Sequence, residues 1–390
     1  MVSNSSSSVQ QPLCHDSENF ALLQFKQSFL IDEHASNDPS AYPKVAMWNS
    51  HGEGEGSDCR SWDGVECDRE TGHVIDLHLA SSFLYGSINS SSGLFNLVHL
   101  QRLDLSDNYF HHFEIRNGIV QLPMLRSLNL SYSVFSSQIP SELLALSELV
   151  FLDLSENPML QHQKPGLRNL VNISSTIPHA LAANLSSLKS LLLEECGLHG
   201  EFPMNIFQLP SLHYLPEFQE TSRLRWLYLG GTSFSGELPT SIGRLGSLIE
   251  LDISSCNFTG LVPSSLGHLT QLSHLVLLNN SFSGQISSFL GNLTQLSYLD
   301  LSNNYFSGQI PSFLANFTQL TSLSLSFNNF NVGTLAWLGQ QTKLTGLDLD
   351  TVNLSGEISS SLVNMSQLTR LDLEENQLTG QIPSWLMDFT

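Results

Sequence analysis

The stretch LDLSNNYFSGQIP (residues 299–311) occurs again, with substitutions, as LDLEENQLTGQIP (371–383) and LDISSCNFTGLVP (251–263). All three follow the form LxLxxNxFxGxIP, and a preceding half of the type LTQLSY (293–298) completes a unit of 24 residues. A fixed period of this length indicates a solenoid, in which each coil buries its apolar face only against neighbouring coils. Solenoids present long binding surfaces, so the repeat favours recognition over catalysis.

The leucine at the centre of each LxL triplet is the predicted core residue of a short strand. Twelve leucines take this place: Leu77, Leu103, Leu128, Leu152, Leu191, Leu227, Leu251, Leu275, Leu299, Leu323, Leu347 and Leu371. Alternate residues of a strand face opposite sides, so the leucines point into the core and their neighbours point outward. Stacked coils would bring these strands into one parallel sheet, about 4.8 Å apart.

Five residues after the strand leucine, a polar side chain recurs where the chain turns inward and buries backbone groups. An Asn amide can satisfy both the carbonyls and the N–H groups of such a turn. We predict this ladder at Asn108, Asn157, Cys196, Cys256, Asn280, Asn304, Asn328 and Asn376, with Ser133 and Thr232 as further members. The position makes both ladder cysteines structural rather than reactive. Val352 occupies it in one coil without a polar atom, so we expect a weaker turn there.

Two intervals between strand leucines depart from the period, with 39 residues from Leu152 to Leu191 and 36 from Leu191 to Leu227. Each interval contains half of a unit that has no complete partner. Half a coil cannot circle the stack, so we infer that a strand-bearing half is missing at each place. The sheet is therefore expected to be irregular or broken between residues 158 and 224.

The chain ahead of the repeats has a different pattern. We predict a disordered segment over residues 1–13 and a capping domain over 14–72, followed by about 12 coils over 73–390 without a C-terminal cap. A helix beginning at Asp16 or Ser17 would place Phe20, Leu23, Phe29 and Leu30 on one apolar stripe. The cap would cover the core of the first coil, which has no neighbour on that side.

Composition excludes several functions. The 390 residues include 36 acidic and only 15 basic side chains, a formal charge of −21, which argues against nucleic acid and suits neutral or basic partners. No window of 18 uncharged apolar residues is present, so no membrane span is expected in this chain. The five cysteines have no metal-ligand spacing and no enzyme motif occurs, so we expect no catalytic residue, metal or cofactor.

Many Asn-x-Ser/Thr sequons favour an extracellular setting and N-glycosylation. The predicted sites within the cap and repeats are Asn89, Asn129, Asn172, Asn184, Asn257, Asn279, Asn292, Asn316, Asn353 and Asn364.

Outward-facing residues of the middle coils combine aromatic and acidic side chains. Exposed aromatic side chains on a rigid sheet provide contact area at low entropic cost. We predict a ligand-binding face at Trp226, Tyr228, Glu250, Asp252, His274, Val276, Tyr298, Asp300 and Phe327. The acidic members favour a basic peptide or protein. The alternative is that these residues merely cover the sheet or contact a glycan.

With CRSWDGVEC (59–67) and the GxIP units, the sequence resembles the ectodomain of plant leucine-rich-repeat receptor-like proteins, the family of the tomato leaf-mould resistance receptors. The likeness implies an α/β repeat solenoid: a right-handed curved superhelix with a parallel β-sheet on its concave face and a small helical N-terminal cap. It also implies an extracellular, plasma-membrane receptor of a plant cell that lacks a kinase and works through partner kinases.

The resemblance carries a disulfide pairing as well. Its cap motif has paired cysteines, but Arg60 takes the second place here. By that likeness Cys14 and Cys59 pair and Cys67 is free, with Cys59–Cys67 as the alternative. The family's signal peptide, membrane span and tail are not found, so we interpret the chain as truncated.

The sequence-based hypothesis is therefore a recognition module that senses a pathogen elicitor in plant defence and engages a co-receptor kinase. Two alternatives use the same fold. One is a secreted inhibitor of the polygalacturonase-inhibitor type, and the other is an ectodomain fragment of a peptide-hormone receptor kinase.

Overall fold

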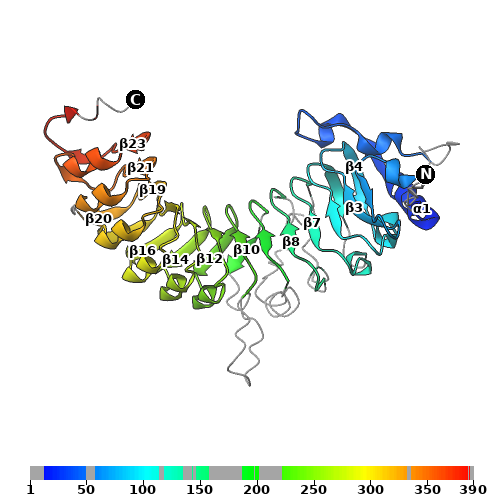
Figure 1. Ribbon diagram of the computed structural model, residues 1–390, viewed down its shortest axis with the longest axis horizontal. Helices are drawn as coiled ribbons and strands as arrows, with labels where there is room; N and C mark the ends of the chain where they lie inside the picture. The colour runs from blue at the N-terminus through cyan, green and yellow to red at the C-terminus, as the bar shows by residue number, and fades with distance from the viewer. Residues whose placement is uncertain are drawn as a thin grey trace, which may run out of the picture. The chain divides into compact units, whose positions relative to one another are not determined.

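The computed structural model describes residues 13–49, 58–113, 118–134, 143, 146–157, 187–196, 198–201, 222–331, 335–384 and 386. It divides into two compact units, Met1–His162 and Gln163–Thr390, each a stack of short coils (Figure 1). The predicted disordered segment lies outside the described residues except for Leu13. Within the described residues, no helix combines the length and apolar character needed to cross a bilayer.

In the first unit, four strands form a parallel sheet with the predicted leucines in register. They are β3 (Val74–His78), β5 (Arg102–Asp104), β7 (Ser127–Asn129) and β8 (Phe151–Asp153). Leu77 pairs with Leu103, and Leu128 pairs with both Leu103 and Leu152. Strand β2 (Val65–Cys67) adds to β3 in the antiparallel direction. A second sheet contains β1 (Phe29–Ile31), β4 (Leu84–Ile88) and β6 (Tyr109–Phe113).

The second unit has the same organisation over eight parallel strands. They are β9 (Ser190–Leu192), β11 (Trp226–Tyr228), β13 (Glu250–Asp252), β15 (His274–Val276), β17 (Tyr298–Asp300), β19 (Ser322–Ser324), β21 (Gly346–Asp348) and β23 (Arg370–Asp372). Each strand leucine pairs with the leucine of the next strand. The predicted repeat fold is confirmed. In Figure 1, β19, β21 and β23 line the inner side of this unit's curve, and short helical turns lie on its outer side.

The far side of each coil is extended and then turns through a short 3₁₀-helix. In the second unit the extended segments are β10 (His199–Glu201), β12 (Ser233–Glu237), β14 (Asn257–Gly260), β16 (Ser281–Gln285), β18 (Tyr305–Gln309), β20 (Asn329–Asn331), β22 (Ser355–Gly356) and β24 (Gln377–Leu378). The 3₁₀-helices span Thr240–Arg244, Ser264–His268, Ser288–Asn292, Ser312–Asn316, Ala336–Gln340 and Ser360–Asn364. In the first unit the equivalent helices span Gly93–Asn96 and Ile119–Gln121, and three further 3₁₀-helices in the cap span Glu33–Ala35, Lys44–Met47 and Cys59–Ser61.

Aromatic side chains stack from coil to coil inside the second unit. Phe258, Phe282 and Phe306 are fully buried, with ring centroids 6.1 Å and 6.4 Å apart. Each burial of this kind contributes roughly 1.5–3 kcal/mol. Equivalent positions of successive repeats therefore form one continuous apolar column rather than a separate core in each coil.

The expected break in the sheet does not occur between β9 and β11. Trp226 pairs with Ser190 and Leu227 with Leu191, although 36 residues separate the two leucines. The two strands are therefore adjacent in the sheet in spite of the longer connection between them. Residues 202–221 of that connection lie outside the described residues, as do 158–186 of the other irregular interval.

The turn after each strand needs a left-handed backbone just before the ladder position. The φ angle is 54° at Asn279, 51° at Phe327 and 47° at Glu375. Asn adopts this conformation readily, whereas other residues with a Cβ carry a strain of roughly 1–2 kcal/mol. The turn is thus maintained by the packing of the stack at several positions where the local sequence disfavours it.

The N-terminal cap contains helix α1 (Asp16–Lys26), but the predicted apolar stripe is wrong. The helix buries Glu18, Ala21, Leu22 and Phe25, while Phe20 is 70% exposed. The buried face begins with a carboxylate because Glu18 accepts a hydrogen bond from the Val74 N–H at 3.0 Å. A search for apolar periodicity alone therefore passes over this face.

The cap also contains a disulfide. Cys14 and Cys59 are bonded, with their Cα atoms 5.7 Å apart, and Cys67 is free and half-buried. This is the first of the two pairings that the sequence left open. Burial raises the pKa of the Cys67 thiol to about 12, with a further contribution from the Glu18 carboxylate.

Candidate ligand-binding surface

The residues on either side of the strand leucines form two adjacent rows on the outward face of the second unit's sheet. Sheet register places one row in the order Trp226, Glu250, His274, Tyr298 and the other in the order Tyr228, Asp252, Val276, Asp300. We call these eight residues the aromatic–acidic surface. Eight of the nine predicted binding residues therefore lie together on four neighbouring strands.

Two of the aromatic members stack on each other, and Trp226 and His274 also contact nearby polar groups. The rings of His274 and Tyr298 stack with centroids 5.9 Å apart at an interplanar angle of 14°. Ser273 Oγ lies 2.9 Å from His274 Nδ1, and the Arg225 guanidinium lies 5.2 Å from the Trp226 ring. Sequence reasoning missed Arg225 and Ser273, which lie two residues before the strand leucine. These contacts hold the aromatic rings in place while leaving each half-buried.

The acidic members are engaged to different degrees. The Tyr228 hydroxyl donates to a Glu250 carboxylate oxygen. The pKa of Tyr228 is raised mainly by burial and, to a smaller extent, by this hydrogen bond. Asp252 Oδ1 accepts from the Ser254 N–H at 2.8 Å. Asp300 is only 8% exposed, and its Oδ1 accepts from the Ser302 N–H at 2.9 Å. Burial raises the pKa of Asp300, which disfavours its charged form, and so little of the side chain is exposed that it offers little contact area.

Phe327, the ninth predicted residue, lies apart from this surface. It is 52% exposed and belongs to the turn after β19, not to a strand. With Asn279, Asn303 and Tyr305 it lines a groove of about 490 Å³ along the ladder turns. The structure therefore separates Phe327 from the other eight residues.

The predicted Asn ladder has the same geometry in successive coils. Asn304 Nδ2 lies 2.9 Å from the Leu277 carbonyl, 3.3 Å from that of Leu301 and 3.0 Å from that of Ser302. Its Oδ1 accepts from the Phe282 N–H at 3.0 Å. Equivalent contacts are made by Asn108, Asn157, Asn280, Asn328 and Asn376.

Other polar side chains occupy the ladder position with fewer contacts. The Thr232 hydroxyl donates to the Leu229 carbonyl at 2.7 Å, and the Cys256 thiol lies 3.2 Å from the same carbonyl. Cys196 Sγ lies 2.7 Å from the Leu193 carbonyl. Burial raises the pKa of Cys256 to about 11, which keeps this thiol protonated and poorly nucleophilic.

The sequons differ in accessibility. Asn89, Asn257, Asn279, Asn292, Asn316 and Asn364 are exposed. The half-buried Asn129 accepts from Ser131, and the half-buried Asn353 donates to the Phe330 carbonyl at 3.1 Å. Asn172 and Asn184 lie outside the described residues. Glycosylation remains a prediction at all ten.

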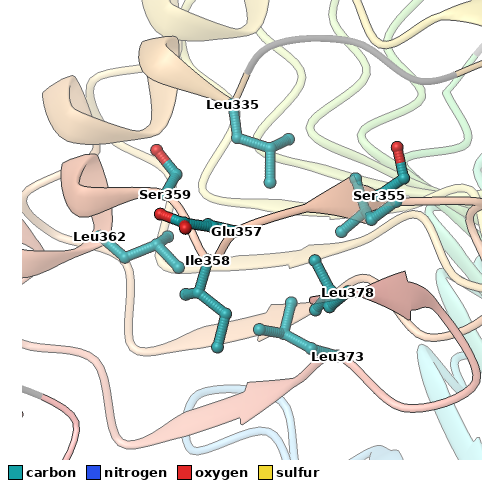
Figure 2. A pocket seen from close by; sticks show the side chains of 9 residues that line it. Leu335, Ser355, Glu357, Ile358, Ser359, Leu362, Leu373 and Leu378 are labelled. Carbon is teal, nitrogen blue, oxygen red and sulfur yellow. The ribbon is translucent and has the colours of Figure 1, made fainter. Parts of the chain in front are cut away.

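A smaller cavity of about 240 Å³ lies between the last two described coils (Figure 2). Figure 2 shows Leu335, Leu362, Leu373 and Leu378 around it, with Glu357 as the only ionisable residue of its lining. Leu373 is half-buried, whereas its equivalent Leu349 in the preceding coil is fully buried. The cavity is the thinly covered core of the last described coil, and we assign it no ligand.

The fold and the repeated sequence are those of a leucine-rich-repeat solenoid. Residues 205–389 match a family model described as a leucine-rich repeat region. Receptor-like protein 6 of Arabidopsis thaliana is 36% identical over 290 residues, covering 64% of this chain and 29% of that protein. Receptor-like protein Cf-9 of Solanum pimpinellifolium is 33% identical over 273 residues, covering 60% of this chain and 31% of that protein.

Solved structures give the same result. The PEPR1–AtPEP1 crystal structure has a TM-score of 0.70 at 27% identity, covering 96% of this chain and 47% of that chain. The crystal structure of the Arabidopsis receptor kinase HAESA with the peptide hormone IDA and the co-receptor SERK1 has a TM-score of 0.65 at 26% identity. The match covers 96% of this chain and 52% of that chain. The resemblance to plant leucine-rich-repeat receptor-like proteins is confirmed. This chain spans about 30% of the length of the curated relatives it matches.

Proposed function

We propose that this chain is part of an extracellular recognition module that binds a peptide or protein on the aromatic–acidic surface. The observation that carries the proposal is that Trp226, Tyr228, His274 and Tyr298 lie in two rows across the adjacent strands β11, β13, β15 and β17, with β13 contributing acidic residues between them. Aromatic side chains on a rigid support bind with little loss of conformational entropy. Four strands in register form such a support.

Charge favours a basic ligand. Glu250, Asp252 and Asp300 lie among the aromatic residues. Of the basic residues, Arg225 contacts the Trp226 ring and His274 stacks on Tyr298. A Lys or Arg side chain placed between the rings could pair with a carboxylate and contact an aromatic face. An acidic ligand would meet repulsion on the same strands.

The comparisons support a peptide or protein as the ligand class. Two of the similar solved structures are described as receptor complexes with the peptides AtPEP1 and IDA. The curated relatives are named receptor-like proteins, and one of them is Cf-9. On this basis we propose a plant cell-surface receptor with a role in defence. SERK1 in the HAESA complex supports a co-receptor kinase as the signalling partner.

A displayed-peptide selection on the full chain tests this function, with pools biased toward basic, neutral or acidic residues. We expect enrichment from the basic pool. The double substitution W226A/Y298A should reduce binding of the enriched peptides at least about 100-fold, because two central aromatic anchors are lost. The melting temperature should change little, since both side chains are only half-buried.

Tyr305→Ala is the matched control. Tyr305 is 65% exposed and lies in β18, away from the aromatic–acidic surface. Binding should survive this substitution. Equal losses in Y305A and in W226A/Y298A would show that the ligand binds elsewhere.

A further inference from the structure

Three imidazole rings lie in a stack beside the buried carboxylate of Glu18 in the N-terminal cap. The ring centroids of His15 and His73 are 4.0 Å apart, and those of His73 and His99 are 3.6 Å apart. Glu18 Oε1 lies 3.2 Å from His73 Nδ1 and 3.6 Å from His99 Nδ1. Helix α1 and the residues just before β3 and β5 bring these groups together from distant parts of the sequence.

The carboxylate of Glu18 is held in a fixed orientation. Its side chain is 6% exposed, and Oε2 accepts from the Val74 N–H at 3.0 Å. Oε1 is thereby directed at the two imidazoles. His15 Nε2 lies 3.0 Å from the Thr71 carbonyl, which keeps that ring against His73. Outer contacts of this kind orient the ligands of metal sites.

His99 Nδ1 carries the second observation. It is buried and has no hydrogen-bond partner among the residues that the structure describes. Its 3.6 Å separation from Glu18 Oε1 is too long for a hydrogen bond. A buried polar atom without a partner is unfavourable, and a cation between this nitrogen and the carboxylate would satisfy both groups.

We propose that Glu18, His73 and His99 form a binding site for zinc. Zinc takes imidazole nitrogen and carboxylate oxygen at about 2.0–2.2 Å, so two ligand atoms of a tetrahedral site lie about 3.4 Å apart. The separations of 3.2 Å and 3.6 Å fall on either side of this value. The three ligand atoms all lie within 4.8 Å of one another. Water would complete the coordination.

Binding requires one ring to tilt. The planes of His73 and His99 are only 19° apart, so their in-plane lone pairs do not converge on one ion. The side chain of His99 is 37% exposed, compared with 27% for His73, which makes His99 the ring with room to move. Zinc would thus open the contact between these two rings.

Calorimetric titration of the full chain with zinc chloride tests the site. We expect one zinc ion per chain at this site and a higher melting temperature with zinc, because the ion binds the folded form. Glu18→Gln and His99→Ala should each weaken binding about tenfold or more. His34→Ala is the matched control, since His34 is an exposed histidine of the same cap, and it should leave the affinity unchanged.

A set of results would overturn the site. The site is rejected if zinc does not bind stoichiometrically or if wild type and H99A bind zinc with equal affinity. It is also rejected if H34A loses as much zinc affinity as H99A. Folding of each variant is checked by mapping the Cys14–Cys59 disulfide. Should H99A not fold, the cobalt(II) spectrum of the wild-type chain decides: intense tetrahedral absorption supports the site, and the weak spectrum of hydrated cobalt rejects it.

Discussion

The coil that contains Asn304 and the coil that contains Val352 differ in how the buried backbone groups of the turn find hydrogen-bond partners. With a single amide, Asn304 contacts two carbonyls of its own turn and one carbonyl and one N–H of the preceding coil. Val352 is 1% exposed and fills the equivalent position with apolar atoms alone. The Val352 N–H instead relies on Asn376 of the next coil, at 3.2 Å.

The difference shows that ladder residues vary in how many backbone groups they bond. An amide satisfies four backbone groups, whereas the hydroxyl of Thr232 reaches one carbonyl and the thiol of Cys256 makes longer contacts. Neighbouring coils share these contacts, because each Asn bonds to the coil before it. One coil can therefore lack the amide and still be held by its neighbours.

The largest effect is expected when the amide is removed. Asn304→Ala leaves the buried turn without a partner for several backbone groups, and it should lower the free energy of unfolding by about 3 kcal/mol or more. Urea denaturation of the full chain, with hydrogen exchange at Phe282, measures this. Asn329→Ala is the control, since Asn329 is exposed. Equal stability of N304A and N329A would refute the ladder's role.

A reciprocal pair of substitutions should give smaller effects of opposite sign. Thr232→Val removes the 2.7 Å bond to the Leu229 carbonyl and should lower the free energy of unfolding by about 1–2 kcal/mol. Val352→Thr can form the corresponding bond to Leu349 and should raise it by up to about 1 kcal/mol. Thermal melting of both variants measures the difference. A loss of stability in V352T would mean that packing outweighs the new bond.

The smallest change to the molecule is to leave Cys256 in place and measure how fast its thiol reacts. The pKa of this thiol is raised from 9.0 to about 11. At pH 8 the native protein should therefore contain about 100-fold less Cys256 thiolate than the unfolded chain, and burial slows the reaction further. Alkylation at pH 8 followed by peptide mapping reports this difference. Rapid labelling of the native protein would show that the turn opens easily.

Sequence reasoning predicted the parts of the molecule that repeat. The strand leucines and the ladder amides follow from spacing, since one unit in register fixes the next. The register also places Trp226 in one row with the later His274 and Tyr298, with Glu250 between Trp226 and His274. Phe327 was grouped with them because it is aromatic and outward, yet it belongs to a turn rather than a strand.

The errors and omissions lie where the repeat gives no information. The face of α1 was misassigned because Glu18 is buried through its bond to Val74, which depends on tertiary structure. The stacked histidines were missed because residues 15, 73 and 99 have no common spacing. The sheet was expected to be irregular or broken between residues 158 and 224, but Leu191 and Leu227 pair across one of the two longer connections. Period alone cannot distinguish an insertion from a missing strand.

The left-handed backbone at position 327 has a practical consequence. A φ of 51° suits Asn or Gly, as at Asn303 and Gly231 in equivalent turns, and it disfavours Phe. Substituting Asn for Phe327 should therefore relieve strain at no expense to the core. The native chain therefore carries at position 327 a backbone strain of roughly 1–2 kcal/mol that an Asn would avoid.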